Sequence, residues 1–137
     1  MRSMRYVLDT TIVSALMRAE RGPATRLLRE SPTSVLVPQP VVAEVAYGLA
    51  RLPRSRRKSD LSERFSVVLA ALDRAAWTDD VSRHFGDLKA ALERAGARVA
   101  DFDLAVAAHA IAYEARVVTR NTRHFARVPG IACEDWS

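Results

Sequence analysis

The sequence predicts an α/β fold in which helices cover both faces of a central parallel sheet. Two observations carry this prediction. Short apolar runs rich in β-branched residues alternate with longer segments whose apolar residues recur every three or four positions. Strands that alternate with helices in this way usually pair in parallel, because each helix crosses back over the sheet. With 137 residues and no repeat or flexible linker, we expect residues 1–137 to form one domain.

The expected strands are short, and polar or turn-forming residues end them. The first runs from Arg5 to Leu8 and stops at Asp9, and the second is closed by the sequence Pro38-Gln39-Pro40. Three further runs complete the set. We expect strands at residues 5–8, 34–37, 75–77, 117–119 and 131–133.

The expected helices lie between these strands. The clearest one opens with Asp79 and Asp80, carries an apolar stripe and ends before Gly96. Another follows the capping sequence Ser59–Glu63 and presents one apolar face as far as Leu72. We expect the remaining helices at residues 10–17, 23–28, 41–49 and 101–114.

The balance of charge favours a nucleic-acid partner. Lys and Arg number 21 against 16 Asp and Glu, which gives a formal net charge of +5, and nearly all of these cations are Arg. Arg forms bidentate contacts with phosphate, so this composition suits nucleic acid. A coding bias toward Arg and Ala in a GC-rich gene is the competing explanation. The basic stretch Arg51–Lys58, interrupted by Pro53, is expected to be a solvated connection, with nucleic-acid contact as the alternative.

The composition also excludes several classes of protein. Cys133 is the single cysteine, so no disulfide can form within the chain. No apolar run approaches the ~20 residues that span a bilayer, and the apolar stretch near the N-terminus is too short for a signal peptide. We therefore expect a cytoplasmic protein without a membrane segment.

Acidic side chains stand where a parallel sheet would present them. Asp9 ends the first expected strand, Glu44 lies in the helix after the second, and Asp103 opens the Ala-rich helix. Ligands of such sheets collect beyond the carboxyl ends of the strands. Converging carboxylates repel one another, and a divalent cation such as Mg²⁺ or Mn²⁺ removes that cost.

Each of these carboxylates also has a simpler explanation. Asp9 suits the N-cap of the following helix, and Asp103 competes with Asp101 for the same role in its own helix. Glu44 lies between apolar positions of a helix and can simply face solvent. Periodicity alone leaves both interpretations open.

Four stretches carry a resemblance to a known family: R5-Y6-V7-L8-D9-T10-T11-I12-V13-S14-A15-L16, V41-V42-A43-E44-V45-A46-Y47-G48-L49, D103-L104-A105-V106-A107-A108-H109-A110 and V117-V118-T119-R120-N121-T122-R123-H124-F125. In order and spacing they resemble PIN-domain ribonucleases, and most closely the VapC-type toxins of bacterial toxin–antitoxin pairs. The resemblance covers nearly the whole chain. It implies a PIN-like α/β/α sandwich around a parallel sheet, Mg²⁺-dependent cleavage of RNA, a homodimer, and an antitoxin that silences the protein with its C-terminal arm.

The resemblance also implies roles for individual residues. Asp9 and Asp103 would bind Mg²⁺, with Mn²⁺ as a substitute. Glu44 would complete the catalytic site, either as a metal ligand through water or by orienting the attacking water. Thr10 would hold the loop after Asp9, and Thr119 would line the floor of the pocket.

The chain departs from the family pattern at Asn121. Many relatives carry a fourth aspartate there, and asparagine keeps an oxygen ligand without the charge. We therefore expect a second metal to bind weakly, or only together with substrate.

The remaining polar residues near this corner are candidates for contact with RNA. Arg120, Arg123 and His124 flank the expected site. His84 and His109 have no spacing that suits metal ligation, and His109 is expected to pack within its helix. Two alternatives to the toxin stay open: a non-catalytic RNA-binding or regulatory PIN-like module, which Asn121 favours, and a nuclease directed at DNA.

Overall fold

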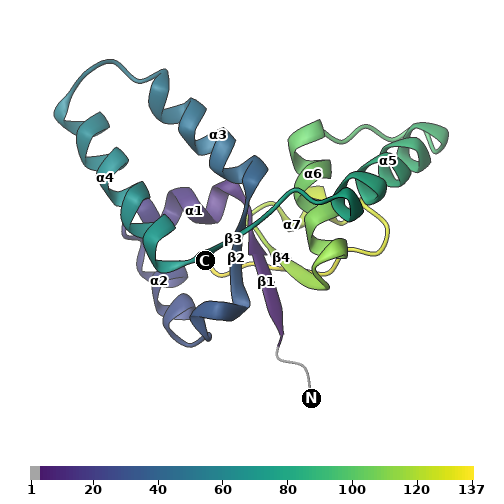
Figure 1. The fold of residues 1–137 in the computed structure, drawn as a ribbon, viewed down its shortest axis with the longest axis horizontal. Coiled ribbons are helices and arrows are strands. Elements are labelled where there is room, and N and C mark those ends of the chain that lie inside the picture. The colour runs from purple at the N-terminus through teal and green to yellow at the C-terminus, as the bar shows by residue number, and fades with distance from the viewer. Residues whose placement is uncertain (1–3) are drawn as a thin grey trace.

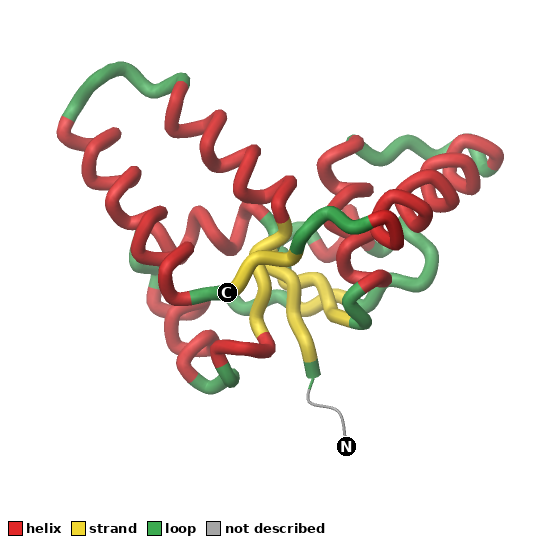
Figure 2. The backbone as a smooth tube through the Cα atoms, viewed as in Figure 1, coloured by secondary structure: helices red, strands yellow, loops and turns green. Residues whose placement is uncertain are grey.

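A five-stranded parallel sheet forms the centre of the molecule (Figures 1 and 2). This computed structural model describes residues 4–137, so the first three residues of the expected domain lie outside the described part. The strand order is β3-β2-β1-β4-β5, and every neighbouring pair is parallel. The predicted α/β class with a parallel sheet is therefore confirmed. The strands are β1 (Arg5–Leu8), β2 (Val35–Pro38), β3 (Asp73–Ala75), β4 (Ala115–Val118) and β5 (Cys133–Glu134).

Helices flank the sheet on two sides. In Figure 1, α1, α2 and α4 lie on one side and α5, α6 and α7 on the other, while α3 rises from the end of β2. α3 and α4 run in opposite directions as a long hairpin. The helices are α1 (Thr10–Met17), α2 (Arg21–Leu28), α3 (Gln39–Ala50), α4 (Arg56–Ala71), α5 (Asp79–Arg94), α6 (Asp101–Ala112) and α7 (Thr122–Phe125), with a 3₁₀ turn at Pro32–Ser34.

The central strand β1 pairs with two neighbouring strands and so positions the residues at its carboxyl end. Its residues pair with β2 on one side and with β4 on the other, with Val7 opposite both Leu36 and Val117. Side chains on both faces of this strand are buried, as expected of a parallel sheet covered by helices. All five strands have the same direction, so their carboxyl ends meet at one edge of the sheet.

Several expected boundaries were wrong. β3 begins at Asp73 rather than at residue 75, because pairing with β2 sets its register. β4 ends at Val118, so Thr119 follows the strand instead of belonging to it. The helix expected from residue 23 starts at Arg21, and α7 was not expected at all.

The basic stretch Arg51–Lys58 is a connection only in its first half. Ser55 caps α4, because its hydroxyl accepts the backbone N–H of Lys58 at 3.1 Å, and the helix begins at Arg56. The last basic residues of the stretch therefore belong to a helix that packs near α1 and α3. Within residues 4–137, no helix is long and apolar enough to cross a membrane.

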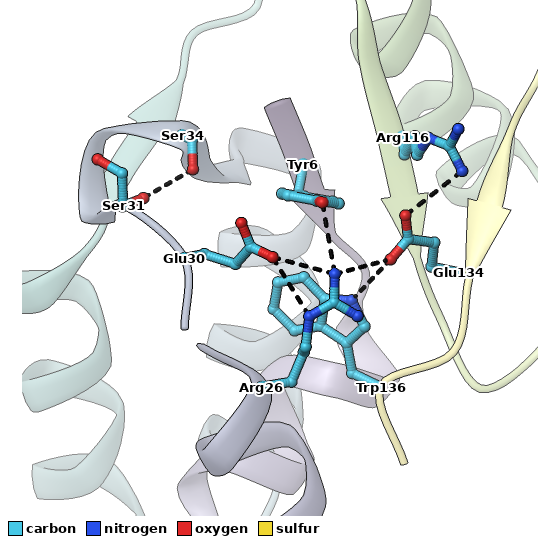
Figure 3. A network of polar contacts seen from close by, with 8 residues as sticks. All are labelled: Tyr6, Arg26, Glu30, Ser31, Ser34, Arg116, Glu134 and Trp136. Carbon is cyan, nitrogen blue, oxygen red and sulfur yellow. Dashed lines mark hydrogen bonds and ion pairs between the residues drawn. The ribbon is translucent and has the colours of Figure 1, made fainter. Parts of the chain in front are cut away.

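A cluster around Arg26 ties the C-terminal segment to the rest of the fold (Figure 3). The guanidinium of Arg26 lies over the ring of Trp136, 5.1 Å from its centroid, and Tyr6 contacts the same ring edge-on. Arg26 also forms ion pairs with Glu30 at 3.0 Å and Glu134 at 3.4 Å. Helix α2, strand β1 and the segment after β5 are thereby joined through one side chain.

Close backbone contact makes Gly22 necessary in α2. A Cβ atom at this position would stand 2.6 Å from the backbone carbonyl carbon of Ser137 and 3.2 Å from the carbonyl oxygen of Trp136. Gly86, in the exposed middle of α5, has no atom within 4 Å of the same position. Gly22 therefore faces a neighbouring backbone, and Gly86 does not.

We predict opposite effects for Gly22→Ala and Gly86→Ala. Gly22→Ala should lower the free energy of unfolding by about 1–3 kcal/mol, because two backbones must move apart. Gly86→Ala should raise it by roughly 0.5–1 kcal/mol, because alanine favours helix without meeting a neighbour. Urea unfolding of both variants measures the difference, and equal effects would contradict the packing of residues 136–137 on α2.

Candidate active site

Asp9 lies at the carboxyl end of the central strand. Its backbone N–H still donates to the carbonyl oxygen of Val118 in β4, at 3.0 Å, although β1 has ended. Its side chain caps α1, because Oδ1 accepts the backbone N–H of Ile12 at 3.2 Å. Asp9 is therefore the N-cap of α1, as one interpretation predicted. Its carboxylate also makes other contacts.

Two threonine hydroxyls also donate to Asp9. Thr11 Oγ1 lies 2.5 Å from Oδ1, and Thr119 Oγ1 lies 2.5 Å from Oδ2. Thr119 is fully buried, as expected for the floor of a site. Thr11 was not predicted, and its place two residues after Asp9 at the start of a helix was the signal that could have identified it.

The charge of Asp9 is buried without a basic partner. Its side chain is 5% exposed, and burial raises the pKa of its carboxyl. Hydrogen bonds from Thr11, Thr119 and Ile12 oppose that rise. No ion pair joins Asp9 to an Arg, Lys or His within residues 4–137. A bound cation would remove this electrostatic cost.

Glu44 is attached to the same corner through Thr10. The hydroxyl of Thr10, the first residue of α1, donates to Glu44 Oε1 at 2.6 Å. Glu44 is half-buried on α3, so it is more than a solvent-facing helix position. The pair joins the helix after β1 to the helix after β2, and no hydrogen bond from residues 4–137 engages Glu44 Oε2.

Asp103 faces His124 across two helices. Its Oδ2 lies 2.9 Å from His124 Nε2, a distance at which a protonated imidazole forms an ion pair. Asp103 is the third residue of α6, whose N-cap is Ala100, so the capping interpretation was wrong for this residue. Asp101, the alternative cap, instead pairs with Lys89 at 3.1 Å.

In the segment after β4, Asn121 contributes its backbone and not its side chain. Asn121 donates its N–H to Thr119 Oγ1 at 2.9 Å, while its exposed side chain makes no capping bond to α7. In this segment it is His124, and not Asn121, whose side chain reaches Asp103. Arg120 forms an ion pair with Glu20, whereas Arg123 is exposed.

The three predicted carboxylates share one edge of the sheet, but they do not yet form a closed metal site. Within residues 4–137, no three Asp, Glu, His or Cys side chains stand close enough together to hold a metal ion. The donors suit a hard cation in type, since carboxylate oxygens are the preferred ligands of Mg²⁺. Glu44 Oε1 accepts a hydrogen bond from Thr10, and Asp103 Oδ2 lies against His124.

The other histidines stay outside this region. His109 is fully buried and its Nδ1 lies 2.7 Å from the carbonyl oxygen of Ala105, as expected for a packed residue. Burial lowers the pKa of its imidazole. His84 lies 3.7 Å from Asp80 on the surface of α5.

A groove opens beside Glu44 between α1, α3 and α4. Its volume is about 640 Å³, and Thr10 and Glu44 lie among its lining residues. The sequence did not predict this α3–α4 groove, because the start of α4 was expected to be a loop. The groove has an apolar lining of Met17, Val45, Leu49, Leu52 and Leu61, and its basic residues are Arg18, Arg56, Arg57 and Arg64.

Comparison with known proteins identifies the family of this chain. The family model for the PIN domain matches residues 6–131. Ribonuclease VapC2 of Rickettsia felis is 30% identical over 135 residues, which are 97% of this chain and 98% of the relative. The chain therefore belongs to the PIN-domain family, and within that family it is of the VapC type.

Solved structures show the same relationship. VapBC2 of Rickettsia felis, bound to a DNA fragment from its promoter, matches with a TM-score of 0.85 and 29% identity over 98% of this chain and 100% of that chain. DNA-bound VapBC of Salmonella typhimurium matches with a TM-score of 0.86 and 25% identity, with the same coverage. Both similarities include every element that surrounds Asp9.

We predict that Mn²⁺ stabilises this protein through Asp9. At a Mn²⁺ concentration of 100 times the dissociation constant, the free energy of unfolding should rise by about 2.7 kcal/mol. Asp9→Asn should abolish the increase, because it removes the buried negative charge. Thermal unfolding with and without Mn²⁺ measures the effect. Asp87→Asn, on the exposed face of α5, serves as the control and should respond like the unchanged protein.

Proposed function

We propose that this protein is a Mg²⁺-dependent endoribonuclease and the toxin of a type II toxin–antitoxin pair. The observation that carries the proposal is Asp9: a buried carboxylate at the end of the central strand, held by three hydrogen bonds and faced by no basic side chain of the described chain. The VapC type supports the assignment, since one relative is named a ribonuclease and solved relatives are VapBC complexes.

Asp9, Glu44 and Asp103 would hold the cation. Asp9 is already oriented by Thr11 and Thr119, and Glu44 by Thr10. When bound, Mg²⁺ lowers the pKa of a coordinated water and stabilises negative charge on a phosphate oxygen. Glu44 Oε2, which no hydrogen bond engages, would orient the attacking water toward the phosphorus in line with the leaving oxygen.

The basic surface supports RNA as the substrate. A net charge of +5, composed mostly of Arg, attracts a polyanion toward an acidic site that would otherwise repel it. Arg123 is exposed next to His124 and is the better candidate for phosphate contact, because the guanidinium of Arg120 is engaged by Glu20.

The α3–α4 groove supports the proposed antitoxin partner. Its apolar lining suits one face of a partner helix, and its four arginines suit acidic residues at the edges of that helix. Because Glu44 and Thr10 lie in the same groove, a segment bound there would end at the acidic site and block it. We also propose that two copies form a homodimer, as the resemblance implies.

Cleavage of RNA tests the proposed activity. In the presence of Mg²⁺, Asp9→Asn and Glu44→Gln should each cleave a mixed RNA substrate at least about 100-fold more slowly than the unchanged protein. Glu93→Gln, an exposed position on α5, should cleave normally. Equal cleavage by all four proteins would reject the site, and no cleavage by any would favour a non-catalytic RNA-binding module.

Binding of the antitoxin tests the groove. Leu49→Glu should weaken binding of the cognate antitoxin by roughly 30-fold or more, because it places a charge in the apolar lining. Leu28→Glu is the matched control, since Leu28 is 87% exposed on α2 and lies outside the groove. Calorimetry with the purified cognate antitoxin measures both affinities. Equal affinities would assign the partner to another surface.

A further inference from the structure

Asp9 is held by two similar arms, each made of a threonine hydroxyl and a backbone N–H. Thr11 Oγ1 donates to Asp9 Oδ1 at 2.5 Å and accepts the backbone N–H of Arg120 at 3.1 Å. Thr119 Oγ1 donates to Asp9 Oδ2 at 2.5 Å and accepts the backbone N–H of Asn121 at 2.9 Å. Both N–H groups belong to the segment that follows β4.

These contacts determine where each hydroxyl proton points. A threonine hydroxyl has one proton and two lone pairs, and a backbone N–H can only donate. Each N–H therefore occupies a lone pair of the hydroxyl, and the single proton is directed at the carboxylate. Since both oxygens of Asp9 receive such a proton, rotation of the carboxylate would break two short hydrogen bonds together. The segment after β4 thus sets the orientation of Asp9.

The Thr11 arm extends further, through the side chain of Arg120. The guanidinium of Arg120 forms an ion pair with Glu20, and its Nε donates to Ser137 Oγ at 3.1 Å. Glu20 lies between α1 and α2 and is also paired with Arg18 at 2.7 Å. Arg120 therefore joins the turn after α1 to the hydroxyl that holds Asp9.

We propose that Thr11 is a positioning residue for Asp9, and that the Arg120–Glu20 ion pair is the outer part of the same chain of contacts. The turn after α1 then influences how well Asp9 binds a divalent cation, although neither Thr11 nor Glu20 contacts that cation. The inference rests on the proposed function, because Asp9 acts there as a metal ligand.

The chain of contacts can be tested without metal. In Thr11→Val, which removes the hydroxyl and keeps the shape, the amide of Arg120 should exchange with solvent roughly tenfold faster. The amide of Asn121, which is bonded to Thr119, should keep its protection. Thr11→Ser should restore the protection of Arg120. Thr25→Val, an exposed position on α2, should leave both amides unchanged. Unchanged protection of Arg120 in Thr11→Val would overturn the proposal.

The consequence for metal binding is tested with Mn²⁺ by calorimetry. Thr11→Val should raise the dissociation constant roughly 10- to 100-fold, as is typical when a partner of a metal ligand is lost, and Thr11→Ser should restore it. Glu20→Gln should raise the dissociation constant for Mn²⁺ by a smaller factor than Thr11→Val does. The double variant should bind no worse than Thr11→Val alone, because Glu20 acts through Thr11. Additive effects of the two substitutions would overturn the role of the ion pair.

Asp9→Asn separates the two proposals. If it loses Mn²⁺ binding while Thr11→Val binds like the unchanged protein, the positioning role is wrong and the proposed function stands. If Asp9→Asn binds Mn²⁺ as well as the unchanged protein does, both proposals fail. The thermal unfolding midpoint of each variant, measured without metal, shows that the comparison is made between folded proteins.

Discussion

The position of β1 between two parallel neighbours is the constraint on which the rest of this molecule depends. Its backbone pairs with β2 and β4 at once, and Val7 and Leu8 are fully buried. Asp9 is the next residue, and its N–H continues the pairing with Val118. A carboxylate placed there is only 5% exposed, so hydrogen-bond donors of the protein must replace most of the water that would surround it.

That stabilisation comes from hydrogen-bond donors and not from basic side chains. The chain carries 21 Lys and Arg, and yet none of those in the described part pairs with Asp9. The guanidinium of Arg120, whose own backbone lies beside the site, is held by Glu20. A paired arginine would neutralise Asp9, but it would also occupy the place of the cation that we propose. Burial raises the pKa of the Asp9 carboxyl, and the hydrogen bonds from Thr11, Thr119 and Ile12 oppose that rise.

The sequence identified the polar residues that follow the strands better than it identified the strand boundaries or the contacts between distant segments. Asp9, Glu44 and Thr119 were predicted because they follow apolar runs or match family motifs, and the structure connects the first and last of these directly. The ion pair of Asp103 with His124 was not predicted, since it depends on how α6 and α7 pack. The hydrogen bond between the backbone N–H of Arg120 and Thr11 joins residues 109 positions apart, so no local pattern in the sequence indicates it. The α3–α4 groove was missed for a local reason, because Pro53 and the run of arginines concealed the first turn of α4, whose cap is Ser55 and not the expected sequence Ser59–Glu63.

The short strand β5 affects when the site around Asp9 can form during synthesis of the chain. The backbone N–H of Thr119 donates to the carbonyl oxygen of Glu134 at 2.9 Å, so the residue beneath Asp9 depends on a partner near the far end of the sequence. Glu134 is held in turn by Arg26 and Trp136. During synthesis, Asp9 leaves the ribosome long before Glu134 does. A nascent chain therefore carries Asp9, Glu44 and Asp103 before it can arrange them, and an interrupted translation product lacks the strand that supports Thr119.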